Sequence, residues 1–201
     1  LEGEFPSAVG YGMTECAPLI TFAMPDKKRF QSCGYPIKGA QIKIDKPDPI
    51  TGIGEVLVKG PMVTKGYYRN EEETKKLFTE DGWMRTGDLG YLDNDNYLYL
   101  KGRLKNVILG PNGENIYPEE IEQVLCEDRG IIEALVLEKE GKLIAYIYPD
   151  YDFLNMELKL LDIEPVQAQE RLEKYFDNLI KQTNQRLPTF SQIKGFNIME
   201  K

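Results

Sequence analysis

Residues 82–106 read GWMRTGDLGYLDNDNYLYLKGRLKN, and their pattern indicates both the type of structure and where one unit of the chain ends. Apolar and polar residues alternate over Leu89–Asp93 and again over Tyr97–Gly102, which is the period of a half-buried β-strand. The polar DNDN cluster between these runs favours a turn, so the two strands are expected to be antiparallel. The pattern changes after Arg103. The sequence therefore predicts that a mostly β unit ends here and that a second unit begins.

Upstream of this stretch, two further alternating runs predict strands at Gln41–Ile44 and Glu55–Gly60, separated by the turn-rich DKPDPITGIG. Between the strands, Asn70–Phe78 is expected to form a short helix, because Asn70 is a good N-cap and acidic residues fill the first turn. The chain up to about Phe22 has no long period and is rich in glycine and small residues, which predicts a loop near a ligand. The strands as a set favour a small antiparallel, β-barrel-like subdomain.

Downstream, the pattern predicts a compact α+β unit. Its expected elements are a hairpin of NVIL and NIY around the turn PNGE, a helix that begins at Pro118, strands Ile131–Glu138 and Lys142–Pro149 around Gly141, a long helix Pro165–Arg186 and a last strand in QIKGFNIM. The apolar face of the long helix is expected to carry Val166, Leu172, Phe176, Leu179, Ile180 and Thr183. The predicted class is thus α+β, with one domain over 1–103 and a second over 104–201.

Composition excludes several classes of protein. The net charge is -8, with Lys and Arg interspersed among Asp and Glu, so the basic stripe that a nucleic-acid binder needs is missing. No apolar run approaches the roughly 20 residues that span a bilayer. The three cysteines, Cys16, Cys33 and Cys126, fit neither a disulfide framework nor a metal knuckle. The predicted location is the cytoplasm, with peripheral attachment to a membrane and the oligomeric state left open.

The absence of histidine limits the chemistry. Without an imidazole, this segment offers no histidine base for a Ser or Cys nucleophile and lacks the commonest zinc ligand. The DNDN cluster, Asp93–Asn96, is also a poor calcium loop, because position six would be Leu98 rather than glycine and position twelve Leu104 rather than glutamate. The remaining expectation is chemistry based on bound phosphates, magnesium and positioning.

Two short motifs suit a nucleotide. In YGMTE, Tyr11 can stack on a purine, Gly12 lets backbone approach a phosphate, Thr14 can hydrogen-bond that phosphate and Glu15 can hold magnesium. In GWMRTGDLG, Asp88 lies between glycines at the start of a strand, where its carboxylate can accept hydrogen bonds from both hydroxyls of a ribose. The alternatives are a surface turn with a buried tyrosine and an ordinary aspartate at a turn.

Two further motifs lie at and after the predicted boundary. In GRLKN, Arg103 can also reach the ribose or the phosphate, and Lys105 lies in the connector between the domains. Taken singly, such residues are more often solvated charges than ligands. In ILGPNGENIYPEEIE, the NG pair is a strong hairpin signal that requires no function.

In their order, YGMTE, GEVLVKGPMVTKGYY, WMRTGDLG, GRLKNVI and GENIYPEEIE resemble the core motifs of the adenylate-forming (AMP-binding) superfamily, which includes acyl-CoA synthetases, peptide-synthetase adenylation domains and luciferases. The resemblance is strong over 11–122 and weaker beyond. It implies the end of the large AMP-binding domain followed by a small lid domain. It also implies ATP, Mg²⁺ and CoA as ligands, together with an acid that is first joined to AMP and then transferred to a thiol.

The resemblance assigns roles by position. Tyr11 resembles the adenine-stacking residue, Thr14 the α-phosphate ligand, and Glu15 the magnesium carboxylate; Gly12 lies in the same motif. Asp88 and Arg103 resemble the pair that binds the ribose. Lys105 matches the hinge about which the lid rotates, and Gly113 matches the glycine beside which the pantetheine of CoA passes.

The resemblance is closest to long-chain fatty acyl-CoA synthetases, because Lys105 and NIYPEE differ from the usual lid segment of peptide synthetases. Two alternatives remain: an adenylating enzyme that loads a carrier protein, and a non-catalytic module with the same fold. The family's phosphate loop would lie before Leu1, and its catalytic lysine would lie after Lys201. Lys201 itself is not in the family's lysine motif and is not assigned that role. The 201-residue chain alone is therefore expected to show no ATP–pyrophosphate exchange.

Overall fold

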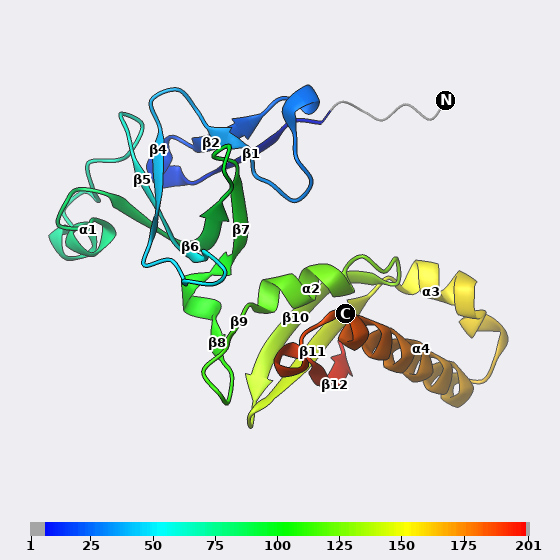
Figure 1. The fold of residues 1–201 in the computed structure, drawn as a ribbon. Helices are drawn as coiled ribbons and strands as arrows, with labels where there is room; N and C mark the ends of the chain where they lie inside the picture. The colour runs from blue at the N-terminus through cyan, green and yellow to red at the C-terminus, as the bar shows by residue number, and fades with distance from the viewer. Residues whose placement is uncertain (1–6, 200–201) are drawn as a thin grey trace. The chain divides into compact units, whose positions relative to one another are not determined.

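The chain forms two compact units, which divide between Lys105 and Asn106 (Figure 1). The structure, a computed structural model, describes residues 7–199. The boundary predicted after Arg103 falls just before that division. Within residues 7–199, no helix combines the length and the apolarity that crossing a membrane requires. Each unit contains its own hydrophobic core.

The first unit is built from two antiparallel sheets. One has the order β1-β2-β3 and the other the order β4-β5-β6-β7. Their strands are β1 (Val9–Gly12), β2 (Leu19–Ala23), β3 (Tyr35–Pro36), β4 (Gln41–Asp45), β5 (Gly54–Lys59), β6 (Met84–Leu92) and β7 (Leu98–Arg103). The four predicted strands are therefore present, but they form an open sheet with β4 and β7 at its edges rather than a closed barrel, since β4 and β7 do not pair.

The prediction of a loop up to about Phe22 was wrong in part, because β1 and β2 pair across this region. These two strands were not predicted because they are too short to show a clear alternation of apolar and polar residues. Apolar residues of both sheets pack into one core, which consists of the fully buried Cys16, Ile20, Val56, Val58, Met84 and Leu98. The β1-β2 hairpin is thereby fixed against the four-stranded sheet, and the turn that carries YGMTE is held on a rigid support.

Helix α1 (Glu71–Leu77) lies between β5 and β6 in the chain. Its cap is the predicted one, since the Asn70 side chain accepts a hydrogen bond of 3.2 Å from the backbone N–H of Glu73. Three acidic residues occupy the first turn and two lysines the last, so the side-chain charges complement the helix dipole at both ends.

The second unit contains a three-stranded sheet of order β10-β11-β12 in which β10 and β11 are antiparallel and β11 and β12 are parallel. Its elements are β8 (Ile108–Leu109), β9 (Asn115–Ile116), α2 (Pro118–Leu125), β10 (Ile131–Lys139), β11 (Lys142–Pro149), α3 (Tyr151–Leu158), α4 (Pro165–Arg186) and β12 (Ile193–Ile198). Short 3₁₀ helices occur in both units: η1 (Thr14–Cys16), η2 (Pro25–Lys27), η3 (Leu104–Asn106), η4 (Leu160–Asp162) and η5 (Thr189–Ser191). The mixed α+β class is thus confirmed.

Helices α2 and α4 pack against the sheet of the second unit, beside which Figure 1 shows them. The core includes Ile121 and Leu125 from α2 and Leu172, Phe176 and Ile180 from α4. Helix α4 has the predicted bounds, and four residues of its predicted apolar face are buried: Leu172, Phe176, Ile180 and Thr183. Leu179 is half-buried, and Val166 in the first turn is 70% exposed. Helix α3 was not predicted.

Candidate functional site

Three residues predicted to bind a nucleotide meet at one carboxylate in the first unit. Asp88 on β6 lies directly opposite Arg103 on β7, and the Arg103 Nη1 donates to Asp88 Oδ1 at 2.6 Å. From β1, the Tyr11 hydroxyl donates to the other carboxylate oxygen, Oδ2, at 2.5 Å. The Asp88 residue is 7% exposed, so this charge is held by two defined partners rather than by bulk water.

The Tyr11 hydroxyl stays protonated throughout the physiological range. Burial, and then its hydrogen bond to Asp88, raise the pKa of Tyr11 well above the usual value for a phenol. Tyr11 therefore acts as a hydrogen-bond donor to Asp88. Its ring, which packs against the first unit's core, is fixed by this bond at the hydroxyl end.

The Asp88 carboxylate retains capacity for a ligand. An ionised carboxylate offers about four lone-pair positions, and the Tyr11 and Arg103 bonds occupy one on each oxygen. Each oxygen can still accept one hydrogen bond. A vicinal diol, which presents two hydroxyl donors side by side, matches the remaining acceptors.

The turn after β1 carries Thr14 and Glu15. Residues Thr14–Cys16 form η1, Cys16 is fully buried, and Ala17 ends the turn in the left-handed conformation at φ 51°. The burial of Cys16 fixes the turn, whereas Thr14 is exposed and Glu15 half-buried. The turn thus presents a hydroxyl and a carboxylate from a backbone anchored in the core.

Glu15 has a partner that sequence reasoning missed. The Tyr67 hydroxyl donates to Glu15 Oε1 at 2.8 Å, and the Thr64 N–H donates to the Glu15 carbonyl oxygen at 2.7 Å. Both partners belong to the VTKGYY string after β5. The sequence signal for this contact was weak: a tyrosine hydroxyl is a hydrogen-bond donor, but nothing in the spacing points from Tyr67 to Glu15.

The YGMTE glycine is required by the fold itself. A Cβ at Gly12 would lie 1.7 Å from the Pro18 carbonyl oxygen, at the register shift between β1 and β2. We expect Gly12→Ala to destabilise the first unit by about 1–3 kcal/mol, because backbone cannot yield as a flexible side chain does. Urea unfolding measures this. Gly52→Ala, at an open exposed turn with φ 71°, is the comparison for backbone strain alone; an equal loss in both variants would contradict the steric explanation.

The DNDN turn is engaged by an arginine. Arg29 contacts Asp93 and Asp95 at 2.6 Å each, and its guanidinium lies 4.0 Å from the centre of the Tyr97 ring. Among residues 7–199, no group of three or more His, Cys, Asp or Glu side chains is arranged to hold a metal ion. The two aspartates thus serve to attach the Arg29 segment to the β6-β7 turn.

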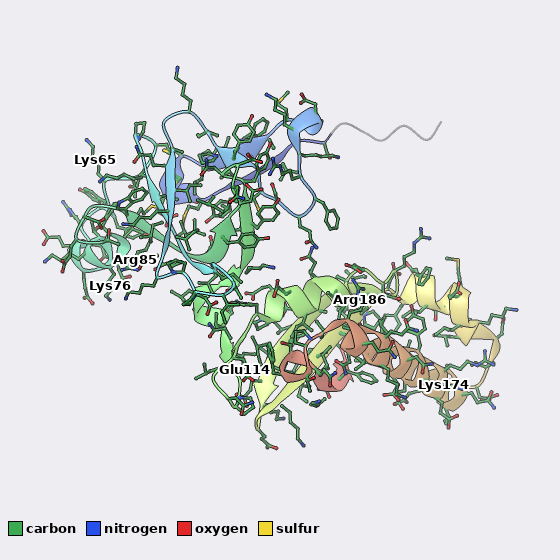
Figure 2. All side chains as sticks on the ribbon, in the orientation of Figure 1. Lys65, Lys76, Arg85, Glu114, Lys174 and Arg186 are labelled. Atoms are coloured by element: carbon green, nitrogen blue, oxygen red, sulfur yellow. The ribbon has the colours of Figure 1, made fainter. Side chains whose placement is uncertain are left out.

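Lys105 and Gly113 lie outside the Asp88 cluster. Lys105 is exposed within η3 and is the last residue of the first unit. Gly113 is exposed at φ 88° in the turn between β8 and β9, next to Glu114, which Figure 2 labels. A Cβ at Gly113 would meet no atom within 4 Å, so only its backbone conformation requires glycine here. Their predicted roles in lid rotation and CoA passage remain predictions.

Comparisons with known proteins identify the family of the chain. A family model described as AMP-binding enzyme matches residues 2–68. A 2-succinylbenzoate–CoA ligase from Enterococcus faecalis is 38% identical over 180 residues, which is 87% of this chain and 36% of the relative. A long-chain-fatty-acid–CoA ligase from Gallus gallus is 36% identical over 148 residues, or 73% of this chain and 19% of the relative.

Among solved structures, the chain is similar to the O-succinylbenzoate coenzyme A synthetase of Bacillus subtilis in complex with ATP and a magnesium ion. The TM-score is 0.74 at 30% identity, over 97% of this chain and 38% of that one. The chain therefore spans little more than a third of the length of the Enterococcus ligase and of the Bacillus synthetase.

Proposed function

The chain belongs to the AMP-binding, adenylate-forming enzyme superfamily, and we propose that it contributes the AMP-binding part of an ATP-dependent acid–CoA ligase. The observation that carries the proposal is the meeting of Tyr11, Asp88 and Arg103 at one carboxylate. Two adjacent strands bring Asp88 and Arg103 together, and Tyr11, 77 residues before Asp88 in the chain, meets them at a group suited to a ribose diol. The proposed co-substrates are ATP, with magnesium, and CoA.

The residues fit the proposed roles in chemical type. Asp88 accepts from the two ribose hydroxyls, Arg103 holds the Asp88 charge in place, and the Tyr11 ring lies against the adenine. Thr14 hydrogen-bonds the α-phosphate, and Glu15 supplies a hard oxygen ligand for magnesium. ATP activates the acid as a mixed anhydride with AMP, so stabilising phosphate charge matters more than a strong base. The lack of histidine in this chain is consistent with that chemistry.

The proposal also concerns which acid the enzyme activates. The motifs favoured a fatty acid, and the chicken relative acts on long-chain fatty acids by its name. The Enterococcus relative, matched over more of this chain and at slightly higher identity, is a 2-succinylbenzoate ligase. We therefore propose 2-succinylbenzoate as the first acid to test and a long-chain fatty acid as the second.

Steady-state turnover tests the proposal. The full-length protein that carries this chain is supplied with ATP, magnesium, CoA and either 2-succinylbenzoate or hexadecanoate. We expect release of AMP and pyrophosphate together with formation of one acyl-CoA. Product formed with a carrier protein but not with CoA would indicate the carrier-loading alternative. Failure of every acid to elicit AMP release would contradict the ligase proposal and favour a non-catalytic module.

A further inference from the structure

The strand that carries Asp88 is interrupted by a bulge. On β5, Glu55 pairs with Leu89 and Leu57 pairs with Arg85. Three residues of β6, Thr86, Gly87 and Asp88, therefore stand opposite the single residue Val56. A bulge of this kind bends the strand and re-aims its side chains. Here it lies directly at the carboxylate that Tyr11 and Arg103 contact.

The Thr86 hydroxyl forms two hydrogen bonds inside the bulge. It donates to the Val56 carbonyl oxygen at 2.8 Å and accepts from the Asp88 backbone N–H at 3.1 Å. Thr86 is 5% exposed, so these two bonds have no competition from bulk water. One hydroxyl thus bridges the Val56 carbonyl oxygen on β5 and the Asp88 backbone N–H on β6.

The Glu55 carboxylate holds the bulge from the neighbouring strand. Its Oε1 accepts from the Gly87 N–H at 3.3 Å, and its Oε2 accepts from Arg85 Nη1 at 2.5 Å. Figure 2 labels Arg85, which lies on β6 just before the bulge. Gly87 adopts φ 71°, a conformation that glycine takes at little cost. Glu55 is itself buried, so its charge requires both partners.

We propose that Thr86 and Glu55 are positioning residues for the nucleotide: they hold the bulge that orients Asp88 towards a ribose diol. Neither side chain is proposed to touch the ligand. The inference rests on the proposed function, because it takes Asp88 to be the group that binds the ribose. Its specific consequence is that loss of the Thr86 hydroxyl weakens recognition of the ribose hydroxyls rather than binding in general.

The test compares two ligands, AMP and 2′,3′-dideoxy-AMP, which differ only in the two ribose hydroxyls. Dissociation constants are measured by NMR titration of the 201-residue chain. Two hydrogen bonds to a charged acceptor predict that the wild-type chain prefers AMP by about 100-fold. In Thr86→Val, we expect this preference to fall below about tenfold, whereas Thr86→Ser, which keeps the hydroxyl, retains it. Glu55→Gln is expected to give an intermediate preference.

Thr79→Val is the matched control. The Thr79 hydroxyl likewise accepts from a backbone N–H, that of Trp83 at 2.9 Å, and it donates to Asp81 Oδ1 at 2.6 Å, with the Trp83 carbonyl oxygen at 3.2 Å, in a loop of the same unit. Thr79→Val should lower the melting temperature as Thr86→Val does, but it should leave the preference for AMP over 2′,3′-dideoxy-AMP unchanged. If Thr86→Val is folded and still prefers AMP over 2′,3′-dideoxy-AMP as strongly as the wild-type chain does, the inference is wrong but the proposed role of Asp88 is not affected. A wild-type chain that binds no AMP, or binds both nucleotides equally, overturns the proposed role of Asp88 and the inference with it.

Discussion

Replacing Asp88 by alanine is expected to lower the affinity of the chain for AMP by about 100-fold, since each hydrogen bond to a charged acceptor contributes about 1.5 kcal/mol or more. The substitution removes the acceptor for both ribose hydroxyls. It also leaves the Tyr11 hydroxyl and the Arg103 guanidinium without their common partner. Isothermal titration or NMR titration with AMP measures the effect, and the melting temperature shows whether the first unit remains folded.

Asp95→Asn is the control for Asp88→Ala. Asp95 lies in the β6-β7 turn of the same unit, is exposed, and pairs with Arg29 at 2.6 Å rather than with Tyr11 or Arg103. Exposed ion pairs contribute little, so we expect its AMP affinity to stay within about twofold of wild type. Equal losses in the two variants would mean that overall acidity, not the Asp88 site, determines nucleotide affinity.

Replacing Phe176 by alanine is expected to destabilise the second unit by about 3–5 kcal/mol, because a buried aromatic ring is lost and a cavity is left behind. Phe176 is fully buried on α4 and lies with its ring centre 5.3 Å from that of Tyr175 and 6.2 Å from that of Phe196. It therefore joins the long helix to β12. Urea unfolding followed by amide signals of β11 and β12 measures the loss.

Val166→Ala controls for the change in helix α4 itself. Val166 lies in the first turn and is 70% exposed, and alanine favours helix more than valine does. We expect the unfolding free energy to change by less than about 0.5 kcal/mol. If Phe176→Ala were as mild as Val166→Ala, the second unit would not depend on the packing of α4 against the sheet.

The elements that the sequence predicted well are those whose pattern is strong and local. Helix α4 has a long 3.6-residue period and a proline at its first position, and its bounds were predicted as observed. Asn70 followed by three acidic residues likewise predicted α1. These patterns depend only on residues close together in the sequence, so they can be recognised without knowledge of the tertiary structure.

The elements that were missed depend on distant contacts. Strands β1 and β2 are only four and five residues long, too short for a period to be distinguished from a glycine-rich loop. Helix α3, YDFLNMEL, directly follows β11, and its apolar residues gave no decisive period. Val166 fits the helical spacing of the buried face, but spacing alone does not show that the first turn of the helix is exposed.

The sequence indicated which residues to examine at the candidate site, but not the contacts that hold them in place. The order of motifs led to Tyr11, Asp88 and Arg103, which the structure brings together. Nothing in the spacing of residues indicated that Tyr67 contacts Glu15 or that a bulge supported by Thr86 and Glu55 orients Asp88. Such supporting contacts arise from strand register, which is set by tertiary packing.

Intermolecular nuclear Overhauser effects between AMP and the isotope-labelled chain test the central claim most directly. We predict contacts from the adenine protons to the Tyr11 ring and from the ribose protons to the backbone amides of Gly87 and Asp88. Contacts that place AMP instead at the α4 face of the second unit, or saturable binding that leaves the signals of Tyr11, Asp88 and Arg103 unchanged, would contradict it.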